Sequence, residues 1–248
     1  SGTITGSASA SKAMGMYIES GLSTLVTSKN VTLLGDKSVG VYVKDTLGSM
    51  SYTNTGVITI GDALLQASPS VGIYSNAQSM TEQGNITVGD NAIGLYSSKI
   101  GSTVKLDTSG MISVGENGTG IYKLGGILQL GGTLKALGSD SVGAYVEGGM
   151  VTNNSTSLVI GSSAYGIVGT AGTGATNITN NSSNVTMGDN SVFIYSSDTT
   201  GTVTNNASLM SPSNKLYGLY GSGTIVNNNT IDYSAGIGNV GIYTTNGG

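Results

Sequence analysis

The side chains of this sequence best suited to chemistry are carboxylates that recur at one point of a repeated motif. Five of them follow a glycine that ends a short apolar run: Asp36, Asp62, Asp90, Glu116 and Asp189. Carboxylates that share a corner could hold calcium, but calcium-binding solenoids use a dense Gly-Gly-x-Gly-x-Asp pattern. This sequence has only one acid per repeat, and Ser139, Ser162 and Pro212 replace the acid in three repeats, so there are too few ligands for calcium. We therefore expect no metal and interpret these acids as turn residues.

The composition also argues against most catalytic sites. The chain has no His and no Cys, its nine basic residues are all lysines, and thirteen acids give a net charge of −4. A Ser-His-Asp triad is impossible without His, and no Gly-x4-Gly-Lys-Ser/Thr loop is present. Polysaccharide lyases and hydrolases need a local cluster of carboxylates, or calcium with a basic residue, whereas the acids here are dispersed. We expect neither enzyme activity nor a cofactor, and no basic stripe exists for nucleic acid.

A Gly-apolar-Tyr triplet recurs along the whole chain. Intact copies occupy residues 15–17, 40–42, 72–74, 94–96, 120–122, 143–145, 218–220 and 241–243. Two degenerate copies fill the one gap, because Gly166-Ile167-Val168 lacks the Tyr and Phe193-Ile194-Tyr195 lacks the Gly. Nine intervals separate Gly15 from Gly241, and the resulting period of about 25 residues lies in the range of solenoid repeats.

Two further elements accompany each triplet. An alternating apolar run that ends in Gly precedes it, as in residues 57–61, 86–89, 111–115 and 185–188. The two glycines are often five residues apart, as in Gly89 and Gly94, and residues that tolerate positive φ lie between them, which indicates a tight corner. A looser element that ends in Asn pairs follows the triplet, at residues 153–154, 180–181, 205–206 and 227–228. Three strands and three corners fit in one period.

These elements predict an all-β fold, a right-handed single-stranded parallel β-helix over residues 1–248. Apolar residues alternate over four or five positions, β-branched residues dominate, and no helical stripe is present. The strands are too short for hairpins of their own, so each backbone group is paired only if a strand bonds its equivalent one repeat later. We expect about ten coils of about 25 residues with three short strands each.

Stacking of like residues predicts what each column does. The apolar residues on either side of the triplet Gly, such as Val39 and Val41, are expected to point inward, and the Tyr outward with the Gly. Nine of the thirteen tyrosines would then form one ladder, unless a bend at the Gly reverses them. Such a ladder could be structural, covering small residues beside it, or could bind a sugar or a protein partner. The Asn column is expected to supply left-handed geometry and stacked amides.

Two sets of residues are candidates for partner binding. The first is the ladder, in particular Tyr74, Tyr96, Tyr122 and Tyr145. The second is an insertion, since Gly61 and Gly72 are eleven residues apart where five are usual, so that residues 64–69 must project from the rod. Projecting loops on rigid scaffolds often recognise partners. The candidate residues of this insertion are its first three, Leu64, Leu65 and Gln66.

Units such as Gly84-Asn85-Ile86-Thr87-Val88-Gly89-Asp90-Asn91-Ala92-Ile93-Gly94-Leu95-Tyr96 resemble the passenger repeats of type V (classical) autotransporters. The likeness is to the large fusobacterial outer-membrane adhesins of the RadD kind, and it covers nearly the whole chain as a style of repeat. It implies a passenger displayed at the bacterial surface, outer-membrane-anchored or secreted, whose parent is anchored by a C-terminal β-barrel. The implied partner is a protein or glycan on host cells or other bacteria.

We expect this sequence to be a segment of a longer passenger, because it begins and ends inside repeats and shows no leader and no run of about 18 apolar residues. No membrane contact is therefore expected within it. A non-catalytic adhesive rod is the favoured function. A passive stalk that projects a distal binding tip is the alternative, and a polysaccharide-degrading β-helix is the less favoured third reading.

Overall fold

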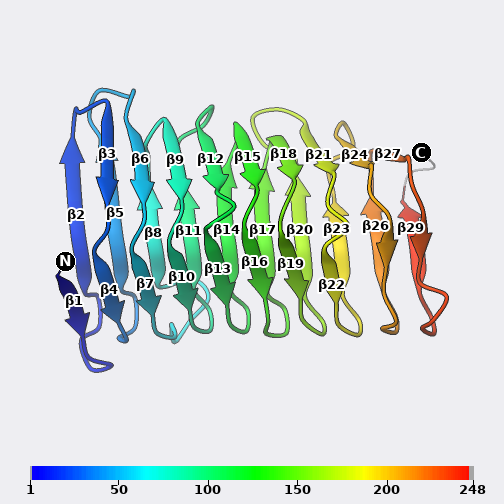
Figure 1. Ribbon diagram of the computed structural model, residues 1–248, viewed down its shortest axis with the longest axis horizontal. Helices are drawn as coiled ribbons and strands as arrows, with labels where there is room; N and C mark the ends of the chain where they lie inside the picture. The colour runs from blue at the N-terminus through cyan, green and yellow to red at the C-terminus, as the bar shows by residue number, and fades with distance from the viewer. Residues whose placement is uncertain (1, 246–248) are drawn as a thin grey trace.

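The structure is a computed structural model that describes residues 2–245. Its secondary structure there consists of 29 short strands joined by turns and loops. The coils follow one another along the long axis from the N-terminus to the C-terminus (Figure 1). Three long sheets run along this axis, and most coils, of about 25 residues, contribute one strand to each. The predicted parallel β-solenoid of about ten coils with three strands per coil is therefore confirmed.

The first sheet contains the alternating apolar runs that precede the triplets. In most of its strands the second and fourth residues are buried, as expected when one face of a strand covers a core. Its eight strands are β1 (Thr3–Gly6), β4 (Asn30–Leu33), β7 (Val57–Ile60), β10 (Asn85–Val88), β13 (Met111–Val114), β16 (Thr133–Ala136), β19 (Ser157–Ile160) and β22 (Val185–Met187).

The tyrosine sheet contains the triplets and is the longest of the three. Its ten strands are β2 (Met14–Ser20), β5 (Val39–Asp45), β8 (Val71–Ser75), β11 (Ile93–Ser97), β14 (Thr119–Leu124), β17 (Val142–Glu147), β20 (Tyr165–Thr170), β23 (Val192–Ser196), β26 (Tyr217–Gly221) and β29 (Val240–Thr244). Both degenerate triplets, in β20 and β23, keep their place in this sheet.

The asparagine sheet completes each coil. Its nine strands are β3 (Thr24–Thr27), β6 (Ser51–Asn54), β9 (Ser79–Glu82), β12 (Thr103–Leu106), β15 (Ile127–Leu130), β18 (Gly149–Asn153), β21 (Thr176–Asn180), β24 (Thr202–Asn205) and β27 (Thr224–Asn227). Near the C-terminus, β25 (Leu209–Met210) and β28 (Ile231–Asp232) form a separate two-stranded sheet, which takes the place of the first sheet in the order of strands.

Strands pair in parallel with the equivalent strand one coil away, so equivalent residues, often of the same type, lie on top of one another. Ile58 pairs with Ile86 and then Ile112 in the first sheet, and Tyr42 pairs with Tyr74 in the tyrosine sheet. Each coil thus satisfies the backbone groups of its neighbours.

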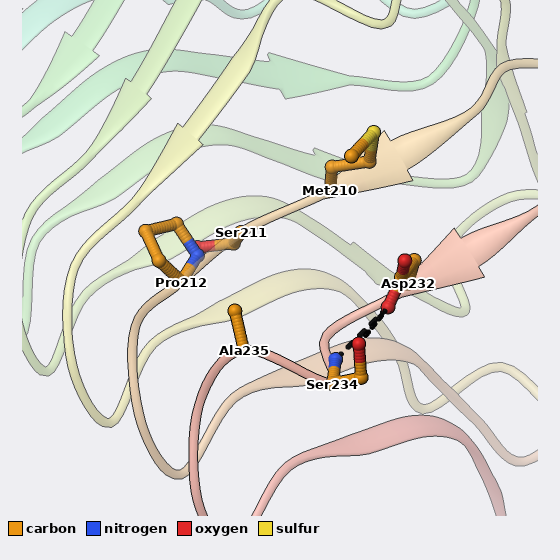
Figure 2. A pocket seen from close by; sticks show the side chains of 6 residues that line it. All are labelled: Met210, Ser211, Pro212, Asp232, Ser234 and Ala235. Atoms are coloured by element: carbon orange, nitrogen blue, oxygen red, sulfur yellow. Dashed lines mark hydrogen bonds between the residues drawn. The ribbon is translucent and has the colours of Figure 1, made fainter.

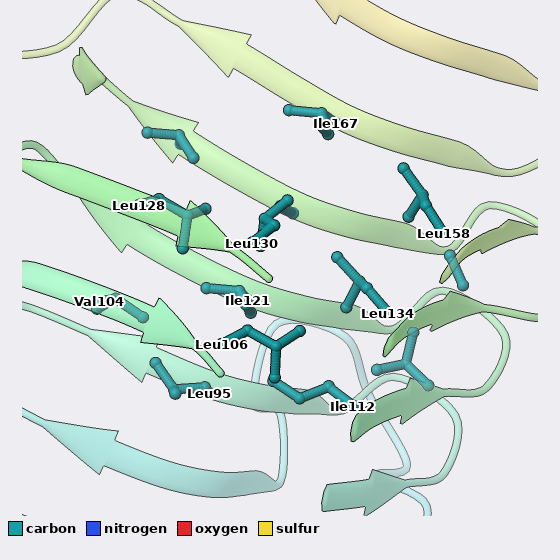
Figure 3. Close-up of a cluster of buried hydrophobic side chains, with 14 of the residues drawn as sticks. Leu95, Val104, Leu106, Ile112, Ile121, Leu128, Leu130, Leu134, Leu158 and Ile167 are labelled. Atoms are coloured by element: carbon teal, nitrogen blue, oxygen red, sulfur yellow. The ribbon is translucent and has the colours of Figure 1, made fainter. Parts of the chain in front are cut away.

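The inward residues of the three sheets meet in one continuous apolar core. Leu95, Val104 and Ile112 come from one strand of each sheet and are each fully buried. Figure 3 shows how such side chains from successive coils fill the interior. Burial of each Leu or Ile stabilises the fold by about 1.5–3 kcal/mol relative to an exposed side chain, so the core is the main source of stability.

The direction of the residues around the triplet Gly differs from the prediction. The residue before the Gly, such as Val39 or Ile93, is only half-buried, whereas the Gly itself is buried and lies inward. A Cβ at Gly94 would come within 2.6 Å of the Gly120 carbonyl oxygen and 2.8 Å of Ile112 Cγ2 in the core. Alternation is therefore interrupted here, with two successive inward positions. The apolar residue after the Gly points inward and the Tyr outward, as predicted.

The corner between the first sheet and the tyrosine sheet uses the predicted positive φ at its third residue. Asn91 and Asn117 have φ of 54° and 52°, each two residues after the Gly that ends the strand. The acid that directly follows this Gly accepts a hydrogen bond from a backbone amide of the next coil. Asp62 Oδ1 accepts from the Asp90 amide, and Asp90 Oδ1 accepts from the Glu116 amide. These carboxylates are therefore turn residues that link successive coils.

Asparagines at the end of the asparagine sheet form two side-chain ladders. In the inner ladder, the buried Asn153, Asn180 and Asn205 each donate from Nδ2 to Oδ1 of the next member at 2.7–2.8 Å. The last acceptor, Asn227, is exposed. An exposed outer ladder links Asn154, Asn181, Asn206 and Asn228 at 2.8–3.0 Å, with the donors pointing the opposite way. The stacked amides are confirmed. The predicted left-handed backbone is wrong, because these asparagines have no positive φ and serve by hydrogen bonding.

Glu82 and Lys123 are ionisable side chains whose residues are fully buried. Glu82 takes the inner asparagine position of its coil, where Asn54 Nδ2 donates to both carboxylate oxygens at 3.0 Å and the Gly84 amide donates to Oε1. Burial raises the pKa of Glu82 to about 8, against the opposing effect of these hydrogen bonds. Lys123 donates to the Lys99 and Leu124 carbonyls and to Ser102 Oγ, and burial lowers its pKa to about 8.

Gly94→Ala is expected to destabilise the protein by about 1–3 kcal/mol, because the new methyl group meets backbone and core atoms. Gly174→Ala is the matched control, since a Cβ there meets nothing within 4 Å, and its effect should stay within about 0.5 kcal/mol. Chemical denaturation followed by circular dichroism measures both. Equal stabilities of the two variants would contradict the inward placement of the triplet Gly.

The buried Glu82 predicts a loss of stability with rising pH. Between its unfolded pKa near 4.5 and its folded pKa of about 8, folding takes up a proton, so stability falls through this window. The loss should be on the order of a few kcal/mol and disappear in Glu82→Gln, which keeps a neutral side chain at all pH values. Denaturation at a series of pH values checks this, with the exposed Glu19→Gln as control. An unchanged slope in Glu82→Gln would contradict it.

Candidate functional site

The outward face of the tyrosine sheet has a ladder of nine tyrosines, which we call the tyrosine ladder. Its members are Tyr17, Tyr42, Tyr74, Tyr96, Tyr122, Tyr145, Tyr195, Tyr220 and Tyr243. The first six stack in one run and the last three in another, with ring centroids 4.8–5.5 Å apart and ring planes within 27° of parallel. The pairing of like strands produces this spacing, which is close to that of neighbouring strands.

The ladder is a half-exposed surface. Tyr74, Tyr96, Tyr122 and Tyr145 are half-buried, because each ring covers its neighbours while its edge reaches solvent. The Tyr122 hydroxyl donates to Glu147 Oε1, and burial together with this hydrogen bond raises the pKa of Tyr122. Tyr122 therefore presents a neutral phenol group. The four predicted ladder residues lie side by side, and the structure is compatible with both the structural role and partner binding.

The inserted loop between β7 and β8 is anchored at its start and exposed beyond. Ala63 is buried, and the Leu64 amide donates to Asp36 Oδ1 at 2.9 Å. The side chains that follow are open to solvent, with Leu64 79% exposed and Leu65 60% exposed. Two exposed leucines on a turn offer apolar contact area to a partner.

Part of the loop lies beside the ladder. Gln66 and Pro69 line a hollow of about 160 Å³ together with Tyr122, Ile93 and Asn117. The structure thus brings one predicted loop residue and one predicted ladder residue to the same surface feature. Leu64, Leu65, Tyr74, Tyr96 and Tyr145 do not line it, so the predicted residues form a stripe with a flanking loop and not one cavity.

A larger hollow interrupts the ladder where the triplet is degenerate. Val168 occupies the ladder position between Tyr145 and Tyr195 in the strand register. A hollow of about 370 Å³ opens there, lined by Val142, Tyr145, Tyr165, Val168 and Tyr195, and we call it the ladder gap. Of these residues, only Tyr145 was predicted from the sequence as a candidate for partner binding. The loss of Tyr from Gly166-Ile167-Val168 was the signal that could have located the gap.

A third hollow, of about 220 Å³, lies near the C-terminal end between β25 and β28 (Figure 2). Met210, Pro212 and Asp232 are among its lining residues. The Asp232 carboxylate already accepts hydrogen bonds from the amide and hydroxyl of Ser234, which hold its pKa below the usual value. The group is engaged within its own turn, and the hollow offers no pair of carboxylates for acid and base roles.

Potential metal ligands are dispersed along the rod. In residues 2–245, no three Asp or Glu side chains lie close enough to hold a metal ion together.

The same part of the chain contains no helix with the length and apolar character needed to cross a bilayer.

Comparison of the chain with protein-family models, with curated proteins and with solved structures gives no match. The site is therefore described by its own geometry, which consists of the tyrosine ladder, the inserted loop beside it and the ladder gap.

Tyr96→Leu should destabilise the protein by about 1–3 kcal/mol, because the ring stacks on both Tyr74 and Tyr122. Tyr17→Leu is the matched control, because Tyr17 stacks on one ring only and is 54% exposed, so its effect should be about half as large. Thermal unfolding followed by circular dichroism measures the difference. If neither substitution changes stability, the ladder has no structural role.

Proposed function

We propose that this chain is a non-catalytic segment of a bacterial cell-surface adhesin, the passenger of an autotransporter, that attaches to a protein or glycan on other bacteria or on host cells. The observation on which the proposal rests is the tyrosine ladder, an aromatic stripe along one face of a rod. Half-exposed tyrosines combine a large apolar surface with a hydroxyl that can hydrogen-bond, which makes them effective contact residues.

The rod itself suits such a role. Each coil is held by backbone bonds to both neighbours and by one continuous core, so the stripe is preorganised before a partner binds. A rigid stripe loses little conformational entropy on binding. The exposed Leu64 and Leu65 beside it extend the apolar area on one side.

The carboxylates support the absence of catalysis in this proposal. Asp36, Asp62, Asp90 and Asp189 each accept a backbone amide hydrogen bond from the next coil. They are committed to corners and lie at one per coil, whereas glycoside hydrolysis needs two carboxylates facing one bond. A passive stalk is the alternative, in which the ladder only stabilises the rod and binding takes place elsewhere in the parent protein.

Attachment of the chain to cells tests the proposal. The labelled protein is expected to bind bacterial or epithelial cells, and the triple variant Tyr74→Thr, Tyr96→Thr, Tyr122→Thr is expected to lose most of that binding, because the centre of the stripe is removed. Threonine keeps the strand propensity of these positions. Flow cytometry measures binding, after circular dichroism has confirmed that the variant is folded.

The control variant changes three outward residues of the asparagine sheet: Gln129→Ala, Thr152→Ala and Thr179→Ala. It should bind cells as the unchanged protein does. Absence of binding by the unchanged protein would indicate the passive stalk. Release of reducing sugar from polygalacturonate or mucin glycans would instead identify a β-helix enzyme and overturn the proposal.

A further inference from the structure

The ladder gap is a missing ring in an otherwise regular stack. Tyr145 pairs with Val168, and Val168 pairs with Tyr195, so the three residues occupy successive positions of one column. Val168 is buried, with 7% of its surface exposed, and forms the floor of the gap. One face of Tyr145 stacks on Tyr122, and the opposite face has no stacked neighbour in the ladder.

The dimensions of the gap match one aromatic ring. Neighbouring ladder rings on the two sides of the gap are 4.9 Å apart. Tyr145 and Tyr195 belong to strands two coils apart, which corresponds to about 9.6 Å at the usual strand spacing. A single flat ring placed between them would therefore lie at ordinary stacking distance from both.

A third tyrosine closes the gap from the side. Tyr165 is the residue before the triplet Gly, a position occupied by Val142 and Val192 in the adjacent coils. Its ring lies 6.3 Å from that of Tyr195 with an interplanar angle of 79°. The gap thus has rings on three sides and valines as its remaining lining. Edge-to-face and stacked contacts are the two arrangements that aromatic rings prefer.

The lining selects for an aromatic occupant. None of the five lining residues has a charged group or an amide side chain, and their only side-chain polar atoms are phenol hydroxyls. A sugar ring bears hydroxyls around its edge that need several hydrogen-bonding partners when they are buried. An aromatic ring needs only the faces and edges that the three tyrosines supply. We propose that the ladder gap is a binding site for an aromatic side chain of a partner protein, inserted between Tyr145 and Tyr195.

Binding of N-acetyl-tryptophanamide tests the site directly. The chain contains no Trp, so the fluorescence of the probe can be excited selectively and followed without background. We expect saturable binding at one site per chain, with a blue shift of the indole emission as the ring leaves water. Absence of saturable binding would overturn the proposal.

Val168→Tyr should fill the gap from within and weaken binding of the probe by about tenfold or more. The variant should fold, because β26 already has this combination of residues. There Tyr217, at the position equivalent to Tyr165, lies beside Tyr220, at the position equivalent to Val168. A folded Val168→Tyr variant that binds the probe as strongly as the unchanged protein would overturn the proposal.

Tyr165→Val is a second variant that does not depend on the first. It copies the residues of the adjacent coils, so the fold should be retained, and loss of the side ring should weaken probe binding several-fold. Unchanged affinity would exclude Tyr165 from the site and contradict the three-sided gap. Methyl β-galactopyranoside serves as the competing ligand, and a gap that binds the glycoside but not the tryptophan amide would be a glycan site, which would overturn the aromatic occupant.

That the aromatic ring comes from a partner protein rests on the proposed adhesive function. Binding of an aromatic ring in the ladder gap does not depend on that function. The two are separated by measuring cell attachment of Val168→Tyr beside probe binding. Loss of both supports a gap that is used in attachment. If the unchanged protein binds the probe but does not attach to cells, the proposed adhesive function is wrong and the aromatic binding site is retained. If Val168→Tyr still attaches to cells, partners bind another part of the ladder.

Discussion

Parallel pairing of each strand with its equivalent one coil later is the constraint on which everything else in this molecule depends. It satisfies the backbone groups of short strands that could not form stable hairpins alone. Because the register shifts by a whole repeat, it also places each side chain on the equivalent residue of the next coil, which in many columns is of the same type. The apolar core, the carboxylate corners, the amide ladders and the tyrosine ladder are consequences of this one pairing.

Stacking of like on like is favourable for some side chains and costly for others, and the sequence follows this division. Tyrosine, asparagine and isoleucine make contacts with their own kind, through ring faces, amides or methyl groups. Charged groups repel one another in a column, and the stacked acids Asp62, Asp90 and Glu116 offset this repulsion through hydrogen bonds, because Asp62 and Asp90 each accept one from the backbone amide of the next acid. Buried Glu82 and Lys123 each lie in a column of other residues, where no like charge lies directly above or below.

The repeat was sufficient to predict the fold, because period, alternation and turn residues all indicate the same coil. It was insufficient around the triplet Gly. Alternation in the sequence predicts Val39 and Val41 on one face, yet the strand places Gly40 and Val41 inward in succession, since a residue without a side chain can lie against the core and against the next coil. The asparagine corner was similarly misjudged, because a preference for left-handed geometry says nothing about whether a residue uses it.

The candidate site was predictable as a stripe but not in its detail. Sequence spacing identified the ladder tyrosines, and the long interval between Gly61 and Gly72 identified the loop. That Gln66 would reach the surface beside Tyr122, two coils further on, depends on how the loop folds back and has no signature in the sequence. Tyr165 was missed because it lies three residues before the column that defines the ladder, where valine is the usual residue.

The two asparagine ladders run with opposed polarity, the inner one donating toward the C-terminus and the outer one toward the N-terminus. Their side-chain dipoles therefore largely cancel, in contrast to an α-helix, where peptide dipoles add along the axis. Each added coil can lengthen both chains of amides without building up partial charge at the ends. Electrostatics of this kind place no limit on the length to which such a rod can grow.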